Sequence, residues 1–187
     1  MAYEIHPQRK KEPGEMSVRL RVEAYDPCPI HAPSPCDCPK RCTGVVEKGD
    51  ICLKQLLQVM QLNIFATNNT IRDTSNTTHA ETANTASSAV KIAAGTGVTS
   101  PAWDDYHLVG QADTPGTATI GAVSGSGTTS TFNITATITA GASRAYSEVG
   151  LTVVINGSIY MLCRDTFTPL NVASSGTLSV TYQISAS

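Results

Sequence analysis

A short stretch near the N-terminus holds four of the six cysteines of this chain and one of its four histidines. The candidate ligands are Cys28, His31, Cys36, Cys38 and Cys42, all within fifteen residues. Structural zinc takes four sulfur or nitrogen ligands in a tetrahedron, and the C-x2-H and C-x3-C spacings let both members of a pair reach one ion. The stretch also contains five prolines, from Pro27 to Pro39, which exclude regular helix and central strand. It therefore needs a staple, meaning a bound metal or a disulfide, to adopt a defined conformation. One structural zinc ion is the first prediction.

Two other states of these cysteines remain open. The spacing matches none of the common zinc frameworks, because paired CxxC motifs are absent. Disulfides would form if the protein met an oxidising environment after its synthesis, and free thiols in a packed loop are the third alternative. Either staple would be structural, because a closed four-ligand site has no open position for a substrate. Cys163 lies in an apolar strand pattern and is expected to be a small buried residue.

Two groups of polar residues could support acid–base chemistry. They are Asp104, Asp105 and His107 in "WDDYHL", and the carboxylate pair Glu148 and Asp165. A carboxylate pair could hydrolyse a glycoside. However, loop aspartates beside aromatic residues commonly form turns, and the neighbouring Arg164 favours a buried or interface ion pair. No nucleophile–base pair can be placed, so we expect that the protein is not an enzyme.

The charge is distributed unevenly along the chain. The net charge is -2, and residues 1–54 hold nine of the thirteen Lys and Arg and eight of the fifteen Asp and Glu. Only eleven charged side chains remain for residues 55–187. A surface with so little charge suits a protein that lies against neighbours in an assembly. The three basic residues of "QRKK" are flanked by glutamates, so a nucleic-acid partner is not expected.

Neither a membrane nor a secretory pathway is expected from the sequence. No stretch reaches the roughly 18 apolar residues of a membrane span. The N-terminal segment has no apolar run after its basic residues, so it does not resemble a secretory signal. We therefore expect synthesis in the cytoplasm of the cell that makes it.

The N-terminal third of the chain has four predicted elements. Residues 1–15 are polar and indicate an extended arm. In "SVRLRVEAY", Val18, Leu20 and Val22 alternate with charged residues, which predicts a half-buried strand. The Cys/Pro-rich loop follows. "GDICLKQLLQVMQL" predicts a helix capped by Asp50, with a strand as the alternative from Val59 onward.

The rest of the chain predicts antiparallel strands. "STFNITATITA", "SEVGLTVVI" and "GTLSVTYQIS" alternate apolar and polar residues, and Asn156–Gly157 is a strong signal for a two-residue hairpin turn. Strands at this spacing, without helices between them, predict a mainly β fold, an antiparallel β-sandwich or jelly roll. The predicted parts are an arm and strand over 1–25, a stapled loop over 26–54, and the β-sandwich domain over 55–187.

Several motifs together resemble a domain of tailed-bacteriophage structural proteins. They are the "GTG-x-T-x-P" turn, the "EVGL" strand entry, the "RDTF" strand exit and the terminal strand "GTLSVTYQIS", and the resemblance covers about residues 59–187. The resemblance implies a β-sandwich virion protein, often oligomeric, of the capsid decoration, head-fibre, tail or baseplate type. It implies no catalytic residues.

The expected function combines this resemblance with the residue patterns. We expect a virion structural protein of the capsid decoration or cement type, anchored on other virion proteins by its N-terminal arm. Val18, Leu20 and Val22 would add a strand to a partner's sheet edge. By analogy with the family, it would form a homo-oligomer, with a trimer expected. The alternatives are a tail or baseplate subunit, and a receptor- or glycan-binding module that uses Trp103, Tyr106 and His107 as a stacking platform.

Overall fold

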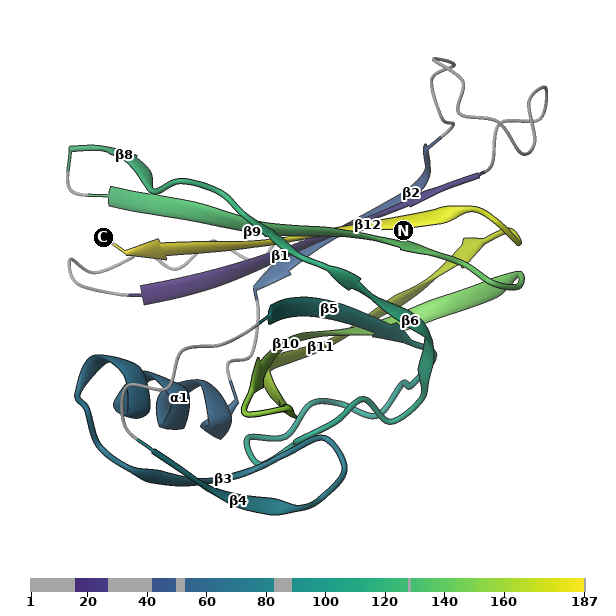
Figure 1. The fold of residues 1–187 in the computed structure, drawn as a ribbon. Coiled ribbons are helices and arrows are strands. Elements are labelled where there is room, and N and C mark those ends of the chain that lie inside the picture. Colours follow the sequence, from purple (N-terminus) through teal and green to yellow (C-terminus); the bar gives the residue numbers. More distant parts are fainter. Residues whose placement is uncertain (1–15, 27–41, 50–52, 83–88, 128, 187) are drawn as a thin grey trace.

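Antiparallel sheets make up most of the protein (Figure 1). The structure, a computed structural model, describes residues 16–26, 42–49, 53–82, 89–127 and 129–186. The first sheet has the order β2 (Cys42–Gly49), β1 (Met16–Tyr25), β12 (Thr177–Ala186), β9 (Thr129–Thr139) and β7 (Thr119–Ile120), and β8 (Ser124–Ser126) also pairs with β9. We call it sheet A.

The second sheet, sheet B, has four strands. Its order is β11 (Ser158–Val172), β10 (Arg144–Ile155), β5 (Ala89–Gly95) and β6 (Gln111–Thr117). A separate hairpin joins β3 (Asn69–Arg72) to β4 (Thr78–Glu81), and α1 (Lys54–Ile64) packs against β3 and β11. No helix within the described ranges is long and apolar enough to cross a bilayer.

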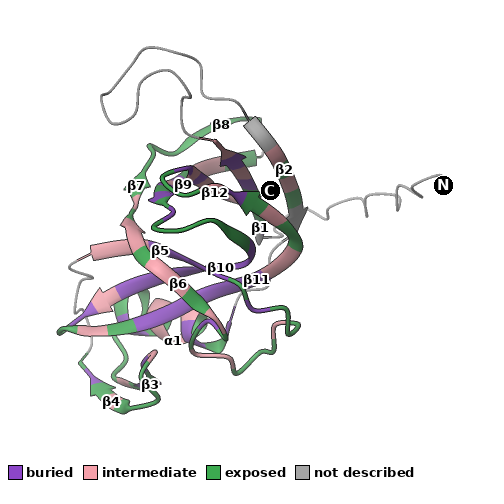
Figure 2. Ribbon diagram, turned by 90° about the vertical axis from the view of Figure 1, so that its right-hand side faces the viewer, coloured by how far each residue is buried: buried purple, intermediate pink, exposed green. Residues whose placement is uncertain are grey.

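The two sheets lie as layers with a shared core between them (Figures 1 and 2). On sheet A, Leu20 lies opposite Tyr182, and Tyr182 lies opposite Ile134, so one row of apolar side chains crosses three strands. On sheet B, Val149, Leu151 and other apolar residues of β10 fill the same core. Alternation in the sequence therefore fixes the register, because a slip by one residue would turn each strand's apolar side chains to the wrong face.

Most of the predicted elements are confirmed. The strand over residues 17–25 is β1, and the predicted hairpin turn joins β10 to β11, with Asn156 at φ 50° and Gly157 at φ 83°. Both residues are in the left-handed region that such a two-residue turn requires. The described strands all pair antiparallel, as predicted.

The helix differs from the prediction at its start. It begins at Lys54, with Leu53 at the N-cap position and no side-chain cap, and Asp50, the predicted cap, lies outside the described residues. The backbone N–H of Leu53 instead donates to the carbonyl of Leu162 in β11, 2.8 Å away. The residues from Val59 onward continue the helix, and the strand alternative is not adopted.

The first two strands belong to the same sheet as the C-terminal strands. β1 pairs with β2 on one side and with β12 on the other. The predicted parts 1–25 and 26–54 therefore each contribute a strand to a sheet that also contains strands of the part predicted over 55–187. Residues 1–15, the predicted arm, lie outside the described residues.

Candidate functional site

The loop that joins β5 to β6, residues 96–110, is attached to sheet B by a buried carboxylate. Glu148 of β10 is fully buried, and its oxygens accept the backbone N–H groups of Gly97 (3.0 Å), Val109 (3.2 Å) and Gly110 (2.6 Å). The same carboxylate pairs with Arg164 of β11, whose Nη2 is 3.0 Å and whose Nε is 3.2 Å from Oε2. A buried charge is tolerable when it is paired and hydrogen-bonded in this way.

Two glycines leave room for this carboxylate. A Cβ atom added at Gly97 would lie 2.4 Å from Glu148 Oε1, and one added at Gly95 would lie 2.6 Å from the same atom. Neither position accepts a side chain unless Glu148 moves. This explains in physical terms why the loop begins with the sequence Gly-Thr-Gly.

Arg164 connects the same carboxylate to the far part of the loop. Its Nη1 lies 2.7 Å from Asp105 Oδ2, and its Nη2 donates to the carbonyl of Thr99 at 3.0 Å. Asp105 also closes a turn, because its Oδ2 accepts the backbone N–H of Ala102 at 2.8 Å. The turn predicted for "WDDYHL" and the ion pair predicted for Glu148 are both confirmed.

The carboxylates of Glu148 and Asp165 do not form an acid–base pair. In the ladder between β10 and β11, Asp165 lies opposite Val149, which points into the core, whereas Arg164 lies opposite Gly150. Because successive side chains of a strand point to opposite faces, Glu148 and Asp165 are on opposite faces of sheet B. Asp165 is fully buried as well. The glycosidase arrangement therefore has no geometric support.

The aromatic residues of the loop have different surroundings. Trp103 is 53 % exposed. The Tyr106 ring packs beside His107, with centroids 4.4 Å apart, and the Arg72 guanidinium lies 4.8 Å from the Tyr106 centroid. Trp103 and His107 are therefore the exposed members of the predicted stacking platform, while Tyr106 is half-buried and already has protein neighbours.

His79 and Asp73 of the β3–β4 hairpin meet Ser158 of β11, and the sequence patterns did not single out this Ser, His and Asp group. His79 Nε2 lies 3.0 Å from Asp73 Oδ2 and 3.2 Å from Ser158 Oγ. In a catalytic triad the two ring nitrogens take separate partners, with the serine on one and the aspartate on the other. Here both partners meet the same nitrogen, so the arrangement is a junction between β4 and β11 and not a triad.

Asp73 has a lowered pKa. Burial by itself raises the pKa of this carboxyl, but hydrogen bonds from Ser75, from the backbone of Thr77 and from His79 outweigh that effect. Next to this group, Glu81 accepts hydrogen bonds from the hydroxyl of Tyr160 and from the side-chain amide of Asn156, the latter at 2.7 Å. Burial, followed by the bond to Glu81, raises the pKa of the Tyr160 hydroxyl.

A third carboxylate, Asp113, ties β6 to β10. It accepts hydrogen bonds from the Tyr146 hydroxyl and from the backbone of Gly141 (3.0 Å), and pairs with Arg144 Nε at 3.1 Å. Burial alone raises its pKa, but these three donors together lower it. A hollow of about 520 Å³ lies beside Asp113. The carboxylate oxygens face these protein donors, which indicates a structural role.

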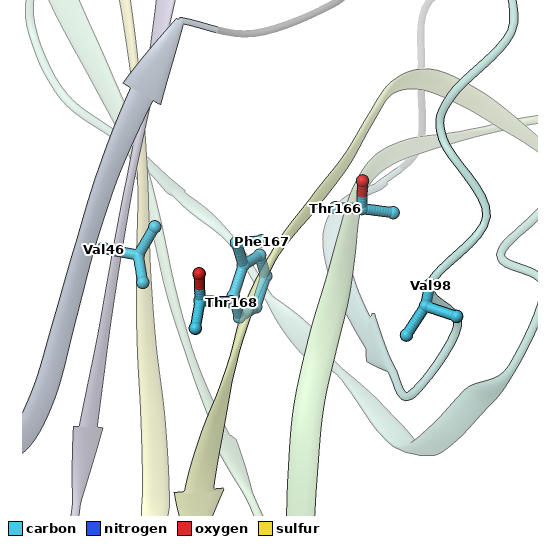
Figure 3. Close-up of a pocket in the computed structure, with 5 residues that line it drawn as sticks. All are labelled: Val46, Val98, Thr166, Phe167 and Thr168. Carbon is cyan, nitrogen blue, oxygen red and sulfur yellow. The ribbon is translucent and has the colours of Figure 1, made fainter. Parts of the chain in front are cut away.

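A second open hollow lies between β2 and loop 96–110 (Figure 3). It measures about 410 Å³ and is lined by Val46, Val98, Thr166, Phe167 and Thr168. This lining carries no acidic, basic or imidazole side chain. The hollow can therefore accommodate an apolar group, but it offers no group for acid–base chemistry.

The residues predicted to anchor a partner lie in the core. Val18, Leu20 and Val22 are buried in β1, at 6 %, 1 % and 0 % exposure. β1 also has a neighbouring strand on each side. This corrects the prediction that β1 adds to a partner's sheet, because its edges and its apolar face are already used within the chain.

The predicted metal ligands cannot be placed. Cys28, His31, Cys36 and Cys38 lie outside the described residues, and only the backbone of Cys42, at the start of β2, is described. Cys163 is buried in β11, as predicted for a small residue in an apolar strand pattern.

The chain matches no protein-family model, no curated protein and no solved structure.

Proposed function

We propose that this protein is a bacteriophage virion structural protein of the capsid decoration or cement type. The observation that carries the proposal is where the phage-like motifs lie. Gly97 and Thr99 of the "GTG" turn, Asp105, Glu148 of "EVGL" and Arg164 of "RDTF" are up to 67 positions apart in the chain and share one hydrogen-bonded cluster. Motifs that meet in one hydrogen-bonded cluster have a structural role. This is what we expect of a family whose members share a fold and not a catalytic site.

The fold type and the surface suit this role. We infer that sheets A and B form an antiparallel β-sandwich of the jelly-roll kind. Of the eleven charged residues in 55–187, five are buried, namely Asp73, Glu81, Glu148, Arg164 and Asp165. The remaining surface is largely uncharged, with Asn133, Thr137 and Thr139 exposed on β9. Such a surface can lie against protein neighbours without desolvating many charges.

The mechanism is passive. A cement protein binds where capsid subunits meet, and the surface it buries stabilises the assembled lattice over its separated parts. In this proposal residues 1–15 provide the anchor, and a trimer is the proposed oligomer. β1 is excluded from the anchor, since it belongs to the core.

The test is attachment of the protein to purified particles. A variant that lacks residues 1–15 should fold with an unchanged unfolding midpoint, because the core strand β1 begins at Met16. It should lose binding to particles, measured by co-sedimentation. The matched control keeps the arm and replaces Lys10 and Lys11 by Gln. It tests whether the positive charge of the arm alone accounts for binding to particles. Full binding by the truncated protein would exclude the arm as anchor.

Copy number distinguishes the capsid from the tail. Native mass spectrometry of particles should find hundreds of copies for a decoration protein, and six to a few dozen for a tail or baseplate subunit. A complete absence from particles would reject both forms of the proposal.

A glycan- or receptor-binding module is the second candidate, favoured by the exposed ring of Trp103. An isolated binding module should retain glycans or cell surfaces by itself, whereas a cement protein should bind assembled particles only. Trp103→Ala should remove glycan binding, with Tyr106→Ala as the comparison, because Tyr106 is already packed by Arg72 and His107.

A further inference from the structure

Loop 96–110 depends on one guanidinium that serves two carboxylates of different accessibility. The side chains of Arg164 and Glu148 are both fully buried, whereas that of Asp105 is 27 % exposed. Water can reach the Asp105 end of the network but not the Glu148 end. The two ends should therefore differ in how easily they open.

The base of the loop is held without Asp105. Glu148 binds the N–H groups of Gly97, Val109 and Gly110, and the N–H of Thr96 donates to the carbonyl of Gly110 at 2.9 Å. Leu108 is buried in a small cluster with Leu53, Ala93 and Met161. Opening the base would leave a buried carboxylate without its backbone donors, which is costly.

The tip of the loop, residues 98–107, has fewer attachments. Arg164 holds it through Asp105 and the carbonyl of Thr99, and the carbonyl of Trp103 accepts the N–H of Lys54 at 3.0 Å. The guanidinium of Arg72 also lies 4.8 Å from the centroid of the Tyr106 ring, at the surface of the protein. If the tip moves away, Arg164 keeps both of its bonds to Glu148. Tip opening therefore creates no unpaired buried charge, whereas base opening does disturb the buried pair.

We propose that loop 96–110 is a two-part latch, in which the tip opens while the base stays closed, and the Asp105–Arg164 ion pair controls the tip. The moving part carries the exposed side chains of Val98 and Trp103. These side chains can then adjust to a neighbouring protein surface without disturbing sheet B. The latch does not rest on the virion role proposed above, and its test needs only the isolated protein.

The first experiment is amide hydrogen exchange on the unmodified protein. The tip amides of Ala102 and Asp105 are both hydrogen-bonded, to Asp105 Oδ2 and to the carbonyl of Ala102. They should still exchange at least about tenfold faster than the base amides of Gly97 and Gly110. Equal rates for the two sets would overturn the proposal, because the loop would then open as one unit.

The second experiment uses matched isosteric variants. Asp105→Asn should make the tip amides exchange about tenfold faster than they do in the unmodified protein. The exchange rates of the base amides should not change. It should also increase acrylamide quenching of Trp103, the only tryptophan in the chain. The control is Asp104→Asn, at the adjacent exposed position, which should change neither reading.

Glu148→Gln should accelerate exchange at both the tip and the base. If this variant does not fold, the unmodified protein and Asp105→Asn still decide the matter. Faster base exchange in Asp105→Asn, or an equal effect of Asp104→Asn, would show that the tip and base are not separate.

Discussion

Two peripheral elements are attached to sheet B by different chemistry: loop 96–110 contacts β10 and β11, and the β3–β4 hairpin contacts β11 and the turn before it. Loop 96–110 depends on a buried cation, Arg164, that faces two carboxylates. The β3–β4 hairpin depends on carboxylates that face neutral donors and one histidine, through Glu81 with Tyr160 and Asp73 with His79. Both elements are connected to sheet B, but only the first requires an ion pair excluded from water.

Because the two attachments differ in chemistry, they should respond differently to substitutions and to changes in pH. Removing one partner of a buried ion pair leaves an uncompensated charge in the interior, whereas removing a hydroxyl leaves only one unmade hydrogen bond. The first attachment should therefore be more sensitive to single substitutions, and the second more sensitive to changes in protonation.

The largest effect is expected for Arg164→Met. This variant leaves Glu148 buried without its cation, so the free energy of unfolding should fall by about 3–5 kcal/mol. Urea denaturation would measure it. The control is Arg144→Met, because that side chain is 38 % exposed and its partner Asp113 keeps two other donors. A similar loss in both variants would mean that burial of the pair does not matter.

The next effect is expected for Tyr160→Phe. The phenylalanine keeps the buried ring but removes the donor to Glu81, so the loss should be about 1–3 kcal/mol. The control is Tyr106→Phe, since Tyr106 is held through its ring by Arg72 and His107. Thermal unfolding of both variants checks the ranking, and a larger loss for Tyr106→Phe would reverse it.

A pH dependence sharpens the comparison further. The pKa of Asp73 is lower in the folded protein, so this carboxylate contributes stability above the ordinary aspartate pKa of about 3.9. That contribution is lost as the pH falls through the lowered value. Asp73→Asn should therefore flatten the curve of unfolding free energy against pH in this acid range, relative to the unmodified protein. Identical curves for the variant and the unmodified protein would contradict the role of Asp73.

The smallest effect is expected for Ser158→Ala. Its hydroxyl lies 3.2 Å from His79 and is one of several bonds at that junction, so the loss should be about 0.5–1 kcal/mol. Chemical denaturation in parallel with Ser179→Ala, a substitution in β12 of the other sheet, provides the measurement. A loss as large as that of Tyr160→Phe would show that the histidine, and not Glu81, dominates the hairpin's attachment.

Local patterns in the sequence predicted much of the fold. Alternation predicted β1, β9, β10 and β12, because side chains on a strand point to alternate faces, and Asn156–Gly157 predicted the hairpin turn. The same reasoning missed the helix start, since Leu53 is held by a backbone bond to Leu162 that is distant in sequence. It also placed Val18, Leu20 and Val22 on a partner, because alternation reveals an apolar face but not what covers it.

The candidate site was predictable only in part. Arg164 beside Asp165, and Glu148 before an apolar run, indicated an ion pair, and the turn at Asp105 followed from its residue type. The guanidinium of Arg164 joins Glu148 to Asp105 only because of the register between β10 and β11. Single residues do not encode that register. Ser75 two positions after Asp73 signalled a local turn, but the contact between His79 and Ser158 spans 79 positions.

The turn at Asn156 has a chemical consequence over time. An asparagine followed by glycine deamidates readily. Because glycine has no side chain, its backbone nitrogen can easily attack the side-chain carbonyl carbon of the asparagine. In this protein the side-chain amide of Asn156 donates to Glu81. Deamidation would replace that donor with a second carboxylate beside Glu81, so two negative charges would repel each other where the β3–β4 hairpin meets the turn. As the protein ages, its hairpin should therefore loosen first, which peptide mapping of stored samples can follow alongside their unfolding.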